Sequence, residues 1–121
     1  MSATCIDLDG TRVLDYAADG PLLRNPQDAV ALLAEARGHG ADLVSVPAER
    51  LAPEFFELRT GFAGEVLQKF VTYRVRLAII GDLSAPAARS AALQSLIHES
   101  NRGNSVWFLA TLDELKARLA R

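Results

Sequence analysis

Hydrophobic and polar positions vary along the chain with two periods, one typical of strands and one typical of helices. The segment RVRLAIIGD is apolar from residue 75 to residue 80 except at Arg76, which predicts a central strand covered on both faces. ADLVSVP and SVWFLA predict two further short, buried strands. CIDLDGTRVLDY predicts a hairpin with Leu8 opposite Thr11, because Asp9 and Gly10 suit a two-residue turn that needs positive φ at both positions.

Helical periodicity follows the hairpin and each of the later strands. NPQDAVALLAEARGHG begins with Asn25 as a capping residue, and its apolar residues recur at the three- and four-residue spacing of a buried helix face. FFELRTGFAGEVLQKF predicts a helix over residues 55–70. SAPAARSAALQSLIHESNRG predicts a third helix over residues 84–103. TLDELKARLAR predicts a fourth, which opens with a capping box at residues 111–114.

These elements follow the order β-β-α-β-α-β-α-β-α. A hairpin followed by alternating helices and strands is typical of a mixed, mostly parallel sheet flanked by helices. We therefore expect a single α/β domain over residues 1–121, with about five strands and four helices, and its length suits one hydrophobic core.

Composition then narrows the classes of function. The net charge is −2 and the 13 basic residues are scattered, so we expect no nucleic-acid partner. No apolar stretch approaches the roughly 20 residues of a membrane span, and the N-terminus lacks the basic and apolar segments of a signal peptide. The single cysteine, Cys5, fits a reducing compartment. We expect a cytoplasmic protein that does not bind membranes.

A first group of polar residues is expected at the carboxyl edge of the parallel strands. The start of the 55–70 helix should approach the end of the strand LAIIGD, where open α/β sheets bind ligands. The candidates for a ligand site or switch are Glu57, Arg59, Thr60, Asp82 and Ser84. Arg59 falls in the middle of the buried face of this helix and needs a carboxylate, for which Asp82 is the natural partner. Alternatively, the helix starts at Thr60 and Arg59 is a solvated loop residue.

Two glycines interrupt the same predicted helix. Gly61, Gly64 and Gln68 share its outward face, although each glycine inside a helix costs about 1 kcal/mol relative to alanine. The glycines leave a flat notch without side chains, which allows another backbone to come close. We interpret this notch as a contact surface for a second subunit, a partner peptide or a neighbouring helix of the same chain.

A second polar cluster is expected at the opposite edge of the sheet, where the helices end. It consists of Tyr73, Arg74, Glu99, Asn101 and Arg102. Glu99 and Arg102 have the i, i+3 spacing of a helical ion pair. We favour a structural role that fixes this edge, and a partner or ligand surface is the alternative. Because the two groups lie at opposite edges, they cannot form one active site within one chain.

The sequence contains no complete catalytic, cofactor or metal motif. His98 and Glu99 are adjacent on a helix and point apart, so we expect no metal site. The run GFAG lacks the context and the third glycine of a dinucleotide fingerprint, so we expect no cofactor. Glu57 and Asp82 could serve as an acid–base pair, but no nucleophile or oxyanion motif accompanies them.

Two blocks of the sequence resemble a known family. FFELRTGFAGEVLQKFVTYRVRLAIIGDLS followed by LIHESNRGN closely resembles the bacterial family called domain of unknown function 4180. The resemblance covers nearly the whole chain and implies a fold rather than an activity. More distantly, the order of elements resembles that of STAS domains, the fold of anti-sigma-factor antagonists and of sulfate-transporter tails.

The STAS resemblance implies a site of phosphorylation. In that family a D-S-[ST]-G-[LI]-G turn opens a helix, and a partner kinase phosphorylates the hydroxyl residue before the first glycine. LRTGFAG stands in the comparable place, so Thr60 matches that residue and Gly61 follows it, whereas Leu58 and Arg59 depart from the motif. A phosphate there would meet the free N–H groups of a helix N-terminus. The alternative is that Thr60 only caps or lines the start of the helix.

The function that the sequence favours is a non-catalytic regulatory or interaction module. It would act through protein binding or self-association, with a switch at the start of the 55–70 helix. The alternative is a small-ligand-binding protein or a weak enzyme, with its site at the carboxyl edge of the sheet.

Overall fold

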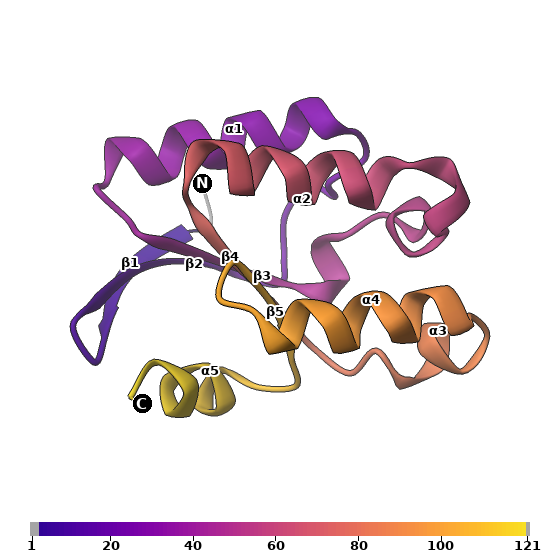
Figure 1. The fold of residues 1–121 in the computed structure, drawn as a ribbon. Helices are drawn as coiled ribbons and strands as arrows, with labels where there is room; N and C mark the ends of the chain where they lie inside the picture. The colour runs from indigo at the N-terminus through magenta and orange to yellow at the C-terminus, as the bar shows by residue number, and fades with distance from the viewer. Residues whose placement is uncertain (1–2, 121) are drawn as a thin grey trace.

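A five-stranded mixed sheet organises the computed structural model, which describes residues 3–120 (Figure 1). Its strands lie in the order β1-β2-β3-β4-β5. β1 (Ala3–Leu8) pairs antiparallel with β2 (Thr11–Tyr16), through the predicted turn. β3 (Leu43–Pro47), β4 (Arg76–Ile80) and β5 (Val106–Leu109) continue parallel to β2. The expected α/β fold with a mostly parallel sheet is confirmed.

The helices are divided unequally between the two faces of the sheet. α1 (Pro26–Gly38) and α2 (Phe62–Tyr73) run side by side over one face, and α4 (Ala91–Arg102) packs on the same face (Figure 1). α5 (Leu112–Leu119) lies against the opposite face. A short helix, α3 (Ser84–Ala88), connects β4 to α4. α1, α2 and α4 each lie in a connection between two neighbouring parallel strands. The three helices lie on the same face of the sheet because all three connections are right-handed and each strand pairs on the same side of the strand before it.

Two hydrophobic clusters follow from this division. The larger one lies under α1, α2 and α4, and Phe55 and Phe70 are among its fully buried side chains. The smaller one lies under α5 and is built from Val13, Leu43, Ala78, Trp107, Leu109 and Leu115. Because side chains alternate along each strand, neighbouring residues of one strand contribute to different clusters.

The first part of the predicted 55–70 helix is not α-helical, so that prediction was wrong at its start. Residues 53–60 form two short 3₁₀ helices, η2 (Pro53–Phe56) and η3 (Leu58–Thr60), after a third one, η1 (Ala48–Arg50). Gly61 has a φ of 78°, in the left-handed region that favours glycine, and α2 begins after it. The positive φ turns the chain by an angle that a continuous helix could not provide.

The predicted helix over residues 84–103 is divided in two, so the chain has five helices in its described part rather than the expected four. α3 ends at Ala88, and Ser90 caps α4, because its Oγ accepts a hydrogen bond of 3.1 Å from the N–H of Leu93. Ser90 therefore satisfies a donor at the start of a new helix. The break brings the α3–α4 junction opposite η2 and η3.

Candidate functional site

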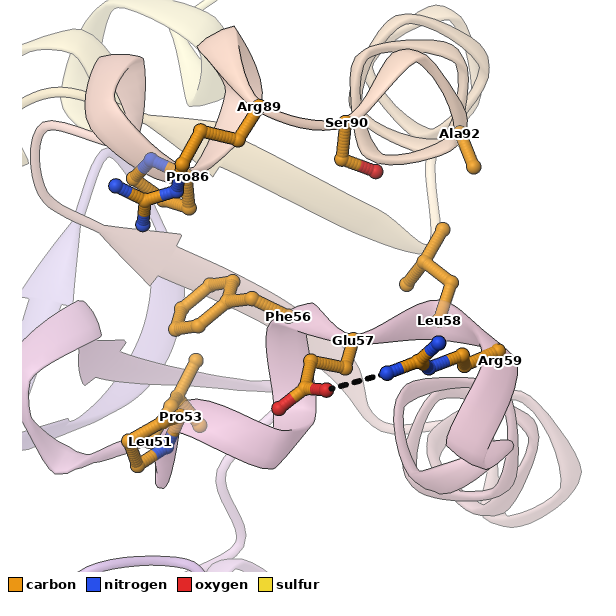
Figure 2. A pocket seen from close by; sticks show the side chains of 10 residues that line it. All are labelled: Leu51, Pro53, Phe56, Glu57, Leu58, Arg59, Pro86, Arg89, Ser90 and Ala92. Atoms are coloured by element: carbon orange, nitrogen blue, oxygen red, sulfur yellow. Dashed lines mark ion pairs between the residues drawn. The ribbon is translucent and has the colours of Figure 1, made fainter.

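A cleft of about 770 Å³ lies between the η2–η3 segment and the α3–α4 junction. Its two walls follow the carboxyl ends of the neighbouring parallel strands β3 and β4, the edge at which ligands bind in open α/β sheets. Figure 2 shows side chains from both walls directed toward the space between them. The first wall comprises Leu51, Pro53, Phe56, Glu57, Leu58 and Arg59. The second comprises Pro86, Arg89, Ser90 and Ala92.

The charges of the cleft are only partly balanced. A guanidinium nitrogen of Arg59 lies 3.7 Å from a carboxylate oxygen of Glu57, and the side chain of Arg59 is 88% exposed (Figure 2). The predicted partnership of Arg59 with Asp82 was therefore wrong, and the alternative of a solvated Arg59 is correct. Within the described part of the chain, Arg89 forms no ion pair. The lining thus holds two guanidinium groups and one carboxylate.

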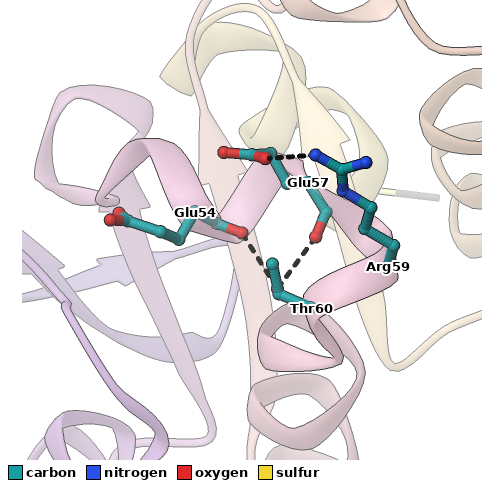
Figure 3. Close-up of polar contacts among 4 residues, drawn as sticks. All are labelled: Glu54, Glu57, Arg59 and Thr60. Carbon is teal, nitrogen blue, oxygen red and sulfur yellow. Dashed lines mark hydrogen bonds and ion pairs between the residues drawn. The ribbon is translucent and has the colours of Figure 1, made fainter.

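Thr60 lies directly before Gly61, the N-cap residue of α2, and its hydroxyl group lines the start of that helix. Its hydroxyl oxygen lies 2.8 Å from the carbonyl oxygen of Glu57 and 3.3 Å from that of Glu54 (Figure 3). The same oxygen accepts a hydrogen bond of 3.2 Å from the N–H of Phe62, at the start of α2. A phosphate on Thr60 would have to give up the donated hydrogen bond. Phosphorylation there stays a prediction.

Asp82 and Ser84 lie in a different hollow, of about 260 Å³, between the end of β4 and α4. The carboxylate of Asp82 accepts a hydrogen bond of 2.9 Å from the N–H of Ser84, which begins α3. Hydrogen bonds from the side chain and the backbone of Ser84 lower the pKa of Asp82, because they favour its charged form. The structure therefore does not gather the five carboxyl-edge candidates into one site.

The glycine notch on α2 faces outward. Gly61, Gly64 and Gln68 are all exposed, and a Cβ added at Gly64 would meet no atom of another element within 4 Å among the described residues. The side-chain amide of Gln68 donates to the hydroxyl of Thr72 at 3.3 Å, one turn along the same helix. A neighbouring helix of this chain therefore does not explain the glycines. Contact with a partner or a second subunit stays a prediction.

In the second polar cluster, Asn101 fixes the edge of the sheet. Its amide nitrogen donates to the carbonyl oxygen of Phe108 at 3.0 Å, and its amide oxygen accepts from the N–H of Phe108 at 2.7 Å. These bonds satisfy the outward backbone groups of β5, which is an edge strand. Glu99 and Arg102 form the predicted ion pair, at 3.7 Å. These contacts agree with the favoured structural role.

The other two members of this cluster contact different parts of the molecule. The guanidinium carbon of Arg37 in α1 lies 5.7 Å from the ring centroid of Tyr73. Arg74 has a φ of 58° and ends α2 in the left-handed conformation. Tyr73 therefore contacts α1, whereas Arg74 ends its own helix, and the five residues of the cluster share no single pocket in the described chain.

The family of the chain follows from its sequence over these same elements. A family model described as Domain of unknown function (DUF4180) matches residues 8–119. The chain belongs to this family. No curated protein and no solved structure gave a significant match. The close resemblance noted in the sequence is thus confirmed, whereas the distant one to STAS domains stays a prediction. The DUF4180 match spans β2 to α5 and includes both walls of the cleft.

Sequence reasoning missed one wall of the cleft in this DUF4180 chain. Arg89 and Ser90 were placed inside a continuous helix, although a serine before an apolar helical stripe is a recognised capping signal. It also missed Arg50, a buried residue that donates to the carbonyl oxygens of Pro21 at 2.8 Å and Ala17 at 2.9 Å. No local spacing indicates a contact across about 30 positions.

Two further properties concern the described part of the DUF4180 chain. None of its helices is long and apolar enough to cross a membrane. Nor do three or more His, Cys, Asp or Glu side chains within residues 3–120 come together as metal ligands would. The cleft is therefore the feature from which a function is best argued.

Proposed function

We propose that this DUF4180 protein is a non-catalytic interaction module whose cleft binds a short segment of a protein partner. The observation that carries the proposal is the mixed lining of the cleft. Phe56, Leu58 and Pro86 offer partly exposed apolar surface, and Arg59 and Arg89 add positive charge beside it. Binding surfaces commonly combine an apolar centre with a charged rim.

The polar groups of the lining favour binding over catalysis. Glu57 is the one carboxylate among the lining residues, and it is already paired with Arg59. The hydroxyl of Ser90 is the one hydroxyl among them, and its oxygen accepts the capping hydrogen bond of α4. A nucleophile or general base needs a free functional group beside an activating partner. Neither lining residue meets that requirement.

The charge of the cleft indicates the chemistry of the partner. Arg89 has no ion-pair partner in the described chain, and a guanidinium group binds carboxylates through two parallel hydrogen bonds. The expected segment therefore carries an acidic residue, which would reach Arg89, next to apolar residues that would cover Phe56 and Leu58. Self-association is included if such a segment comes from a second copy of the chain.

Selection from a displayed random peptide library tests this proposal directly. The wild-type protein should enrich peptides that combine acidic and apolar residues, and Arg89→Glu and Leu58→Asp should bind the enriched peptides at least tenfold more weakly. Lys116→Glu is the matched control, because this exposed residue lies on α5, on the opposite face of the sheet. Enriched peptides that bind all four proteins equally would refute a role for the cleft.

The size of the cleft supports one alternative. A volume of about 770 Å³ falls in the range of small-molecule sites, roughly 300–1,000 Å³. Native mass spectrometry of the protein purified from its own host distinguishes the two. A retained small molecule that is lost in Arg89→Glu would favour ligand binding, and its absence together with peptide enrichment would favour the interaction module.

Regulation at the start of α2 belongs to the same proposal. Thr60 directly follows Arg59, the last residue of the first cleft wall, so a phosphate on Thr60 would add negative charge near an acidic partner. Thr60→Glu should weaken binding of the selected peptides, whereas Thr60→Ser, which keeps the hydroxyl group and its hydrogen bonds, should not. We further propose a cytoplasmic location, since the single cysteine, Cys5, is a free and exposed thiol.

A further inference from the structure

Two arginines stack on one tryptophan at the face of the sheet that α5 covers. The guanidinium carbons of Arg76, from β4, and Arg118, from α5, each lie 4.5 Å from the ring centroid of Trp107. Trp107 is only 4% exposed, and its indole N–H donates to the carbonyl oxygen of Gly103 at 2.7 Å. A hollow of about 310 Å³ lies beside this stack. The other residues that line it are Thr11, Asn104 and Leu119.

Each guanidinium group uses only part of its hydrogen-bonding capacity. The Nε of Arg76 donates to the carbonyl oxygen of Asn104 at 2.9 Å, and Arg118 donates to the carbonyl oxygen of Asn101 at 2.7 Å. An arginine side chain has five N–H donors, so most donors of both groups are left for another partner. Within residues 3–120, neither arginine forms an ion pair with a carboxylate.

The two positive charges are held close together. Because both guanidinium carbons lie 4.5 Å from the same ring centroid, they are separated by at most twice that distance. This separation is comparable with the screening length at physiological ionic strength, about 8 Å, so the two charges repel each other. Stacking on an immobile indole also restricts the guanidinium groups before any ligand arrives. An anion in the hollow that both groups line would relieve the repulsion.

We infer that this hollow is an oxyanion site that binds a phosphate group. Planar guanidinium groups match the geometry of phosphate oxygens and form paired, charge-assisted hydrogen bonds with them. The hydroxyl of Thr11 in the lining offers an additional donor. The volume of the hollow admits a phosphate ion or a phosphate carried by a small organic molecule.

The site is separate from the cleft proposed above. Arg76 begins β4, so the hollow lies at the amino-terminal end of the parallel strands, on the α5 face. The cleft follows the carboxyl ends of β3 and β4. Failure of one proposal therefore leaves the other standing.

Trp107 is the only tryptophan of the chain, so its fluorescence reports on this hollow alone. The purified protein is titrated with inorganic phosphate, with sodium chloride replaced to keep the ionic strength constant. A saturable change in Trp107 emission is expected. Arg118→Gln should weaken the binding at least tenfold, because one guanidinium group is lost, whereas Arg102→Gln, an exposed arginine paired with Glu99, should bind as wild type.

A second variant keeps the test decisive if Arg118→Gln fails to fold. Arg76→Lys keeps the positive charge but removes the planar guanidinium group with its paired N–H donors, so this variant should also bind phosphate more weakly. A parallel titration with glycerol phosphate identifies the source of the phosphate group. Tighter binding of glycerol phosphate than of inorganic phosphate would assign the site to phosphorylated small molecules. Equal binding of the two would assign it to the phosphate ion itself. The inference is wrong if chloride alone reproduces the change in wild type, or if both variants titrate like wild type. Lower thermal stability in the variants with no phosphate effect in wild type would leave only a structural role.

Discussion

The two glycines at the start of α2 should respond in opposite ways to the same substitution. Gly64→Ala adds a methyl group on the exposed face of the helix, where it would meet no atom of another element within 4 Å in the described structure. Replacing glycine by alanine inside a helix stabilises it by up to about 1 kcal/mol. The φ of Gly64 lies outside the left-handed region, so alanine adopts it without strain.

Gly61→Ala is the matched control. Gly61 has a φ of 78°, and an L-residue held in the left-handed region costs about 1–2 kcal/mol. A Cβ there also meets no other element within 4 Å, so the expected loss comes from the backbone alone. Unfolding entropy of about 2.1 cal/mol/K per residue gives about 0.25 kcal/mol/K for 121 residues. Gly64→Ala should therefore raise Tm by up to about 4 °C, and Gly61→Ala should lower it by about 4–8 °C.

Thermal unfolding followed by circular dichroism at several protein concentrations measures both shifts. A lower Tm for Gly64→Ala in dilute solution would refute the open face of α2. If the notch is a self-association surface, Gly64→Leu should also abolish the association seen by sedimentation velocity while the monomer stays folded. Association that persists in Gly64→Leu would exclude the notch as its site.

Two further predictions follow from hydrogen bonds of Asn101 and Tyr16. Asn101→Leu should destabilise the protein by about 2–3 kcal/mol, because two backbone groups of Phe108 lose their partner, and amide exchange of Phe108 should accelerate. Glu99→Gln should change stability by less than about 0.5 kcal/mol, and an equal loss in both variants would contradict this account. Burial, then the hydrogen bond to Glu35, raises the pKa of Tyr16. Its stabilising contribution is present below the unfolded pKa, about 10, and is lost as pH rises above it. Tyr16→Phe should therefore flatten the loss of stability between pH 10 and pH 11 in urea titrations, and an unchanged slope would refute the assignment.

The strands could be predicted because their signals are local. The apolar run of β4 and the Asp9-Gly10 turn of the hairpin carry enough information by themselves, and the structure agrees with both. Helix ends were less certain for a physical reason. Gly61 is compatible with a helix or with a left-handed break, and the sequence does not state which φ it adopts.

The candidate site depended on contacts that no local pattern reveals. Arg59 was assigned to a buried face by extending the helix through Gly61, and it is solvated because that extension is absent. Residues 51–59 and 86–92 meet only after β3 and β4 have paired, so the spacing between them along the chain carries no sign of the cleft. Glu57 and Arg59 could nevertheless be placed near this edge from the sequence, because polar residues after a parallel strand gather at its carboxyl end.

The strand order of the sheet also bears on how the chain is made. Each strand lies beside the one that precedes it in the sequence. When a strand leaves the ribosome, the strand with which it pairs has therefore already been made. The sheet can grow by addition of one strand and one helix at a time, without waiting for distant segments. α5 emerges after all five strands, and until it does, Val13, Leu43 and Ala78 stay uncovered on its face of the sheet. The nascent chain is therefore most prone to aggregation in the interval after β5 has been made and before α5 has emerged.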